Sequence, residues 1–258
     1  MDITNIIDIA SLGNKLWCET LGYKVEEFAT FTFLRSTFFN DSSYNYIIPK
    51  VVNSELDWAA ADAIIQKQRL INWHVSYYIR QLHIKSDYDG ILLGKGYEKA
   101  EEESYVFLSM EHEIVTDDTE YEVVTVQTID DYANVAKICF PGWVSNEAFS
   151  RALFAAQQKD SCKNYLAKYE GKISGIGGVL YSKEFNLGYL TNACTLPDSR
   201  GKGVQQRMIQ KRCAELFKMG ITQVFSIAEP GCISYHNLLK NGFEDVDRYA
   251  LYTQVSKN

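Results

Sequence analysis

Apolar residues in the second half of the chain follow two different periods. Between Asn164 and Leu196, three runs have the composition and spacing of strands: NYLAKYEG, KISGIGGVLYS and LGYLTNACTL. Short turns at Gly171 and at KEFN join them, which predicts an antiparallel meander. From Val204 to Met219 apolar residues recur at helical spacing, so we expect an amphipathic helix whose Gln, Lys and Arg residues face water. The predicted core stripe of this helix is Val204, Met208, Ile209, Cys213, Leu216 and Phe217.

Other elements are predicted on both sides of this block. A strand near Val123–Thr128, a helix near Ile129–Cys139 and a helix near Asn146–Gln158 precede the meander. After the amphipathic helix, ITQVFSIAE (221–229) has the pattern of another strand. A helix, a Gly-Phe pair and a last strand follow it.

Two segments of the chain resemble each other, LLGKGYEKAEEESYVFLS from Leu92 and LLKNGFEDVDRYALYT from Leu238. In each, a glycine fits the left-handed cap at a helix C-terminus, Gly96 in one and Gly242 in the other. A strand pattern rich in Tyr and Val follows each glycine. This ending is common in α/β units, so it indicates duplication only together with what precedes it.

A helix and a strand precede both copies, and this shared order predicts two related halves. In the first half they are SELDWAAADAIIQKQ (54–68) and LINWHVSYYI (70–79). We expect domains at 1–117 and 118–258, joined in the acidic stretch 111–122. With a helix-like opening at 2–21 and fewer strands, the first half is expected to be an abbreviated copy.

Composition excludes several classes of protein. The 258 residues are 46% hydrophobic and 13% aromatic, enough to fill the core of a globular fold. A net charge of −7 argues against a nucleic-acid partner, which would require a clustered basic face. No run approaches a membrane span and the first residues lack a signal-peptide pattern, so we expect a cytoplasmic protein. The six cysteines form no CxxC pair and the four histidines do not cluster, so no metal site is expected.

The stretch RGKGVQQR, from Arg200 to Arg207, lies between a predicted strand and the amphipathic helix. At a helix N-terminus the first backbone amides lack intrahelical partners and the helix dipole is positive, so an anion binds well there. Gly201 and Gly203 allow phosphate oxygens to approach the backbone, while Arg200 and Lys202 add positive charge. The alternative is a tight turn with solvated basic residues. Neither a Walker-type nor a Rossmann phosphate motif is present.

Together with the order of elements from Val123 to Thr253, LPDSRGKGV resembles the acyl-CoA signature R/Q-x-x-G-x-G/A of the GCN5-related N-acetyltransferase (GNAT) family. The last small position of that signature is Gln205 here, as in a subgroup with the turn R-G-x-G-V-Q. The resemblance implies an α/β (α+β) GNAT fold, in which a mixed, mostly antiparallel twisted sheet is flanked by helices. The first half, a degenerate GNAT-like domain, has no glycine near its helix start and is not expected to bind CoA phosphates.

The resemblance also implies acetyl-CoA as the co-substrate and assigns residues to it. Its diphosphate would lie on the turn, and its pantetheine arm would pair with backbone at the end of the preceding strand. A subgroup pattern, S-x-x-N-x-x-x-x-G-F, adds two residues beside that arm. The cofactor-binding residues expected from the resemblance are Cys194, Thr195, Leu196, Arg200, Gly201, Lys202, Gly203, Val204, Gln205, Ser234 and Asn237.

In this family an amine attacks the thioester directly, and many members use a tyrosine as the acid four residues before the Gly-Phe pair. That position is Leu238 here. Tyr235 and His236 lie within one helical turn of it and could replace the acid, or simply pack and face solvent. Glu229, at the end of a predicted strand, is the candidate base or else a cap for the next turn. A covalent role for Cys194 is not expected, because it has no evident His partner.

These observations predict an acetyl-CoA-dependent N-acetyltransferase that acts on a primary amine of a small molecule or peptide. The alternative is a non-catalytic protein that binds CoA as a structural or sensory ligand, which the leucine at position 238 would suit. The sequence leaves the acceptor open, and a homodimer is one option for its assembly.

Overall fold

The computed structural model describes residues 24–37, 40, 45–50, 56–80, 87–116, 120–141 and 160–254. These residues form two compact units. One contains residues from Tyr105 to Val246, and the other contains residues from Gly22 to Ser104 together with those from Asp247 onward. The division differs from the expected ranges 1–117 and 118–258, because residues from Tyr105 onward group with the C-terminal unit and the end of the last strand groups with the N-terminal unit. That the two halves are related stays a prediction.

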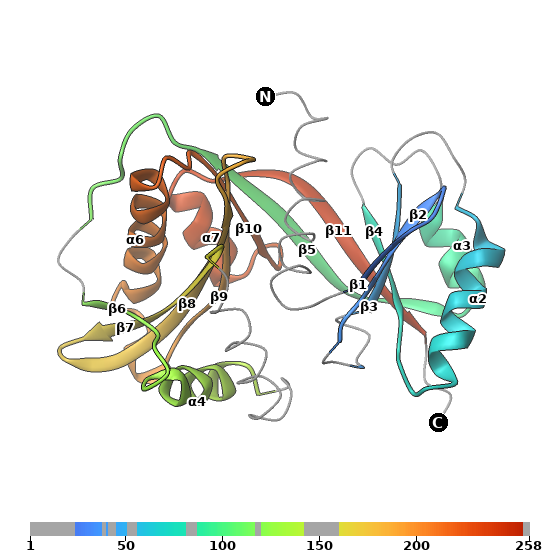
Figure 1. The fold of residues 1–258 in the computed structure, drawn as a ribbon, viewed down its shortest axis with the longest axis horizontal. Coiled ribbons are helices and arrows are strands. Elements are labelled where there is room, and N and C mark those ends of the chain that lie inside the picture. The colour runs from blue at the N-terminus through green and yellow to red at the C-terminus, as the bar shows by residue number, and fades with distance from the viewer. Residues whose placement is uncertain are drawn as a thin grey trace. The chain divides into compact units, whose positions relative to one another are not determined.

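The N-terminal unit is a small sheet with two helices. Its elements are β1 (Lys24–Glu27), β2 (Phe31–Arg35), β3 (Asn45–Pro49), α2 (Trp58–Arg69), β4 (Ser76–Arg80), α3 (Tyr88–Gly94), the start of β5 (Tyr97–Ser109) and the end of β11 (Glu244–Gln254). β1, β2 and β3 are antiparallel neighbours, β4 is parallel to β3, and β11 is antiparallel to β4. Both helices pack on the same face (Figure 1), where Phe33, Ile65 and Leu92 belong to one buried core.

Three expectations for this unit need correction. The helix expected from Ser54 begins at Trp58, because the Asp57 carboxylate accepts the Ala60 amide and caps it there. The strand expected from position 70 begins at Ser76, since 70–72 form the turn that ends α2. Strands β1 to β3 were not expected from the sequence. The helix expected at 2–21 lies outside the described residues.

The C-terminal unit contains the meander and the amphipathic helix. Its elements are the end of β5, β6 (Tyr121–Val123), α4 (Ile129–Cys139), β7 (Cys162–Tyr169), β8 (Lys172–Ser182), β9 (Leu187–Thr195), the short 3-10 helix η2 (Pro197–Ser199), α6 (Val204–Lys218), β10 (Gln223–Ala228), α7 (Ile233–Lys240) and the start of β11. Within this unit the strand order is β6-β7-β8-β9-β10-β5. β6 to β9 are antiparallel neighbours and β10 is parallel to β9.

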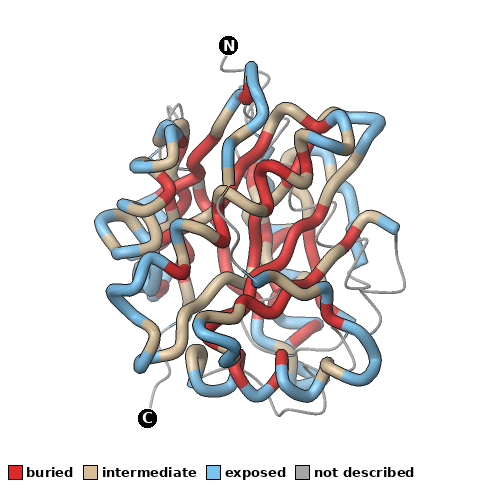
Figure 2. The backbone as a smooth tube through the Cα atoms, turned by 90° about the vertical axis from the view of Figure 1, so that its left-hand side faces the viewer, coloured by how far each residue is buried: buried red, intermediate tan, exposed pale blue. Residues whose placement is uncertain are grey.

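Helices cover both faces of this sheet. Successive strand residues point to opposite faces, so Tyr165 joins the core under α6 and α7 while Leu166 joins the core under α4. Figure 2 shows the buried residues running along the strands. The expected fold class, a mixed and mostly antiparallel sheet flanked by helices, is confirmed. Of the helices in the described part of the chain, none is long and apolar enough to cross a membrane.

Most elements expected in this unit are confirmed, and one strand is wrong. The meander, the helix at Ile129–Cys139 and the helix from Val204 are present, and Gly242 has the left-handed backbone expected of a cap, with φ of 86°. Gly96, in the N-terminal unit, also has the expected left-handed backbone, with φ of 82°. The strand expected at 123–128 ends at Val123. Thr128 instead caps a turn by accepting the Thr125 amide with its hydroxyl at 2.9 Å. The helix expected at 146–158 lies outside the described residues.

Candidate functional site

Strands β9 and β10 separate near their C-terminal ends. Their parallel register pairs Leu187 with Gln223 and ends at Leu190 with Ser226, although β9 continues to Thr195. The Ser226 hydroxyl donates to the Leu190 carbonyl at 2.8 Å. The backbone acceptor at the end of the ladder is therefore bonded to a side chain. The last part of β9 therefore has an edge that is not paired with β10.

A bulge changes the direction of β9 at this point. On β8 the paired positions move two residues, from Gly178 to Ile176, while on β9 they move three, from Thr191 to Cys194. The extra residue on β9 accompanies a left-handed conformation of Asn192, with φ of 50°. The strands approach closely here, since a Cβ added to Gly175 would lie 2.6 Å from the Cys194 carbonyl oxygen. Glycine at that position allows the approach.

The three strand residues expected to contact the pantetheine arm are not equivalent. The Leu196 amide donates to the Ser174 carbonyl at 2.9 Å, so it is already used within the sheet. Neighbouring residues of an antiparallel strand direct their backbone groups to opposite edges, so Thr195 presents its amide away from β8. Arg200 Nε lies 3.5 Å from the Thr195 carbonyl. The buried Thr195 hydroxyl has no hydrogen-bond partner among the described residues.

The turn before α6 has a concentration of free amides. Gly201 and Gly203 have φ of 75° and 74°, and Gly203 is the N-cap of a helix that begins at Val204. None of the amides from Gly201 to Gln206 donates a hydrogen bond to a described residue, and the first bond of the helix is from Arg207 to the Gly203 carbonyl at 3.1 Å. Amides in this arrangement bind anions, and the dipole of a fifteen-residue helix adds positive potential.

Arg207 and Tyr169, which the sequence analysis missed, contact this turn. Arg207 donates to the Lys202 carbonyl at 2.7 Å. The Arg207 guanidinium and the Lys202 ammonium lie 5.6 and 5.3 Å from the ring centre of Tyr169, at the end of β7. The cation–π contacts fix the turn between a helix and a strand. Arg207 could have been found as the residue one helical turn after Gly203, whereas nothing in the β7 pattern marks Tyr169.

Three of the expected cofactor-binding residues meet in one hydrogen-bond network. The Gln205 side-chain amide donates to the Ser234 hydroxyl at 2.9 Å, and Asn237 donates to the Gln205 side-chain oxygen at 2.8 Å. The network joins the first turn of α6 to α7. Gln205, which occupies the small position of the signature, therefore links the two helices.

The comparison with known protein families gives this geometry a context. Residues 129–243, from the start of α4 to the Gly-Phe pair, match the model of the acetyltransferase (GNAT) family. These residues form a GNAT-family domain. No curated protein is detectably similar to it in sequence.

Several solved structures share the GNAT fold of the chain. A GCN5-related N-acetyltransferase from Kribbella flavida has a TM-score of 0.68 at 11% identity, with 95% of each chain covered. One from Sphaerobacter thermophilus has a TM-score of 0.63 at 11% identity, with 86% of this chain and 79% of that chain covered. A functionally unknown conserved protein from Staphylococcus epidermidis ATCC 12228 has a TM-score of 0.67 at 12% identity, covering 90% of this chain and 93% of its own. At these identities the likeness shows the fold.

The three candidate catalytic residues of this GNAT domain lie at the start of α7 and just before it. The Tyr235 hydroxyl donates to Asp245 at 2.9 Å, while His236 is exposed and its Nδ1 lies 2.8 Å from the Cys232 carbonyl. Glu229 follows β10 directly, is exposed, and its carboxylate has no hydrogen-bond partner among the described residues. Leu238, at the usual acid position, is 2% exposed and belongs to the core.

The Glu229 side chain does not cap the following turn. Cys232 is the N-cap of α7, and its sulfur accepts the Tyr235 amide at 3.3 Å. The backbone carbonyl of Glu229 accepts the Cys232 amide, but its carboxylate takes no part. The alternative role of Glu229 as a side-chain cap is therefore not seen in the structure.

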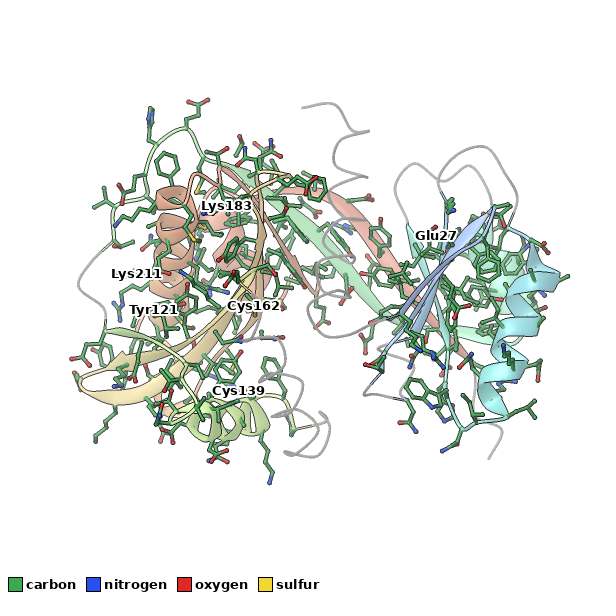
Figure 3. All side chains as sticks on the ribbon, viewed as in Figure 1. Glu27, Tyr121, Cys139, Cys162, Lys183 and Lys211 are labelled. Carbon is green, nitrogen blue, oxygen red and sulfur yellow. The ribbon has the colours of Figure 1, made fainter. Side chains whose placement is uncertain are left out.

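The thiol of Cys194 is not poised for nucleophilic attack. Burial raises its pKa well above the ordinary value, and the neighbouring Cys139 raises it further. Cys139 lies on α4 (Figure 3) and shares the apolar cluster of Cys194. A protonated thiol in an apolar environment is unlike the thiol of a reactive cysteine. Within the described residues no group of His, Cys, Asp or Glu side chains could hold a metal ion.

One expectation for α6 is wrong. Arg212, expected to face water, is 1% exposed and lies among the largest fully buried side chains. Positions 204, 208 and 212 are separated by four residues, so they share one face of the helix, and Val204 and Met208 are buried too. Helical spacing alone could have placed Arg212 in the core.

Proposed function

We propose that this chain is an acetyl-CoA-dependent N-acetyltransferase that transfers the acetyl group to a primary amine of a small molecule or peptide. One observation carries the proposal: the free amides from Gly201 to Gln206 lie at the start of α6, and η2 connects this turn to the unpaired end of β9. The turn suits the diphosphate of CoA, and the strand edge suits the amide-containing pantetheine arm. The free Thr195 hydroxyl supports the same placement.

The reaction that this site would perform needs no enzyme nucleophile. The amine nitrogen attacks the thioester carbonyl, the C–S bond breaks, and the CoA thiolate leaves and takes a proton. A backbone amide at the bulged end of β9 would stabilise the negative charge on the carbonyl oxygen. Glu229 would accept the proton of the amine, because its carboxylate is exposed and unbonded. Of the two candidates for protonating the thiolate, His236 is exposed, whereas the Tyr235 hydroxyl is engaged by Asp245, so His236 is the better placed.

A second candidate is a CoA-binding protein without turnover. The observations that favour it are the buried Leu238 at the usual acid position and the hydrogen bond from the Tyr235 hydroxyl to Asp245, which engages that hydroxyl. Both candidates bind the CoA diphosphate at the same turn. They differ only in whether the bound acetyl group is transferred. The homodimer and the cytoplasmic location stay predictions.

Titration calorimetry and a thiol-release assay together test both candidates. We expect CoA and acetyl-CoA to bind at one site per chain with similar affinity, since the turn contacts only the shared diphosphate. We expect thiol release with at least one member of a panel containing a polyamine, an aminoglycoside, an amino acid and a peptide N-terminus. Binding without release for any amine would favour the second candidate. No binding at millimolar CoA would overturn both.

A further inference from the structure

The charged side chain of Arg212 is buried beneath the bulge of β9. It is 1% exposed, and it makes three hydrogen bonds to backbone carbonyls. Nε donates to Met208 in its own helix at 3.1 Å, while Nη1 donates to Gly178 on β8 at 2.9 Å and to Thr191 on β9 at 3.3 Å. A guanidinium is costly to bury, so its place in the core calls for a specific role.

The two sheet carbonyls that Arg212 binds lie opposite each other at the bulge. Gly178 and Thr191 form the last regular pair before the extra residue on β9, and Asn192 then takes its left-handed conformation. A bulge interrupts the ladder of backbone hydrogen bonds. The guanidinium therefore bridges the two strands at the point where the ladder is interrupted.

Strand β8 has a glycine, Gly177, where the Arg212 side chain packs against it. A Cβ added to Gly177 would lie 3.2 Å from the guanidinium carbon of Arg212 and 3.3 Å from Nε and Nη1. These separations are tighter than ordinary van der Waals contact, so glycine leaves room for the guanidinium against β8. The sequence GIGG at 175–178 thus serves both the close approach of the strands and the burial of the arginine.

The positive charge of Arg212 is held by carbonyl dipoles. No carboxylate of a described residue forms an ion pair with it. Burial raises the pKa of Tyr121 and Tyr132, and the opposing effect of the Arg212 charge is smaller, so both hydroxyls stay neutral. The carbonyls of Gly178 and Thr191 are therefore fixed by charge-assisted hydrogen bonds, which are stronger than neutral ones.

We propose that Arg212 is a positioning residue for acetyl transfer: by binding both carbonyls at the bulge, it fixes the direction in which the end of β9 presents its amides to the thioester. The inference rests on the proposed function. It gives Arg212 no contact with substrate. Loss of the bridge would leave the diphosphate turn intact and would misalign the acetyl group.

Two variants with matched controls test the proposal. Arg212→Met removes the bridge, with Lys211→Met on the same helix (Figure 3) as its control. Gly177→Ala displaces the guanidinium by a methyl group, with Gly94→Ala, whose added Cβ meets no atom within 4 Å, as its control. The readouts are the urea midpoint, the Kd for CoA, kcat, and amide hydrogen exchange of residues 191–196.

For folded Arg212→Met we expect Kd for CoA within threefold of wild type, kcat at least thirtyfold lower, and faster exchange at 191–196. Gly177→Ala should give the same pattern, with a kcat loss of about tenfold. If Arg212→Met does not fold, the Gly177→Ala variant tests the proposal instead. A merely structural role would lower the urea midpoint while leaving kcat of the folded protein and exchange at 191–196 unchanged, and that outcome overturns the inference. If the wild-type protein shows no turnover, only the proposed function is contradicted. Hydrogen exchange at residues 191–196 still reports whether Arg212 holds the bulge in place.

Discussion

The side-chain nitrogen of Asn237 lies 2.8 Å from the side-chain oxygen of Gln205, and this hydrogen bond connects α7 to the first turn of α6. Gln205 uses its own nitrogen to donate to Ser234 at 2.9 Å. Both polar ends of one side chain are thus occupied by a neighbouring helix. The backbone amide of Gln205 donates to no described residue, so the network fixes the orientation of this amide without using it.

Replacing Gln205 by Ala should weaken CoA binding. The substitution removes both hydrogen bonds and frees the start of α6 to move, so we expect Kd to rise about tenfold, or about 1.4 kcal/mol. Gln206→Ala, one position along and exposed, is the control and should leave Kd unchanged. Calorimetry checks both variants. Equal Kd values for the two would show that the network has no part in binding.

Gly203 and Gly220 stand at opposite ends of α6, and both have left-handed backbone, with φ of 74° and 82°. Alanine at either position should cost about 1–2 kcal/mol of stability, because a side chain disfavours that conformation. Only Gly203→Ala should also weaken CoA binding, since it adds a methyl group and strain where the amides of the proposed site would contact the phosphates. Urea unfolding and calorimetry separate the two effects. A similar rise in Kd for Gly220→Ala would contradict an anion site at the turn.

The sequence pattern within a single segment predicted the helices and tight turns, because their structure depends mainly on neighbouring residues. Helix α4 and the hairpin at Gly171 follow from periodicity and turn residues. Strand β2 was missed although Phe31 and Phe33 alternate with polar neighbours, so a signal was present and unused. The bulge at Asn192 and the end of the β9–β10 ladder depend on register between strands, which no single segment encodes.

The candidate site divides in the same way. The geometry of the glycine turn was predictable, because two glycines before a helical pattern mark a helix N-terminus and tolerate a left-handed backbone. The roles of Tyr235 and Leu238 were not, because each depends on which neighbour the folded chain supplies. Asp245 provides the acceptor for Tyr235 from a strand that follows α7, and the core provides the surroundings of Leu238.

Cys194 should prove chemically inert. Its pKa is raised by burial and by Cys139, and burial raises the pKa of Cys213 to about 12, so both remain thiols at pH 8. Since the thiolate is the reactive form, iodoacetamide should alkylate both far more slowly in the native protein than in urea, as peptide mass spectrometry would measure. Cys194→Ala should keep kcat within threefold. An acetylated Cys194 in protein incubated with acetyl-CoA would instead indicate a covalent intermediate.

Glu229→Gln tests the proposed proton acceptor. General base catalysis typically contributes 10²–10⁴-fold, so kcat should fall by about 10² or more while Kd for acetyl-CoA stays the same. Glu244→Gln, another exposed carboxylate of this unit, serves as the control and should retain full activity. If Glu229→Gln keeps wild-type kcat across the pH profile, the amine loses its proton to water and needs no dedicated base.

Tyr235→Phe separates packing from acid catalysis. The ring belongs to the core around α7 and the hydroxyl donates to Asp245, so the substitution should cost about 1 kcal/mol of stability. Because that hydroxyl is engaged by a carboxylate, we expect kcat to change less than threefold. Urea midpoints and thiol-release rates measure the two quantities. A hundredfold loss of kcat in a folded variant would assign Tyr235 the acid role that Leu238 cannot fill.

Glu103 in the N-terminal unit makes stability depend on pH. Burial raises the pKa of this carboxyl above its ordinary value of 4.5, and the opposing hydrogen bond from Tyr78 is a smaller effect. A raised pKa means that the folded state binds the proton more tightly than the unfolded state does. The contribution of Glu103 to stability is therefore present at low pH and is lost as pH rises through its folded pKa.

Glu103→Gln should accordingly raise the urea midpoint at pH 8, where the wild-type carboxylate is charged in a poorly solvated place. The gain should shrink toward pH 4.5, because glutamine and the protonated acid then have the same charge and nearly the same shape. Glu98→Gln, an exposed carboxylate on the same strand, should show no such dependence on pH. A wild-type protein that is more stable than Glu103→Gln at pH 8 would mean that the bond to Tyr78 outweighs the cost of burying the charge.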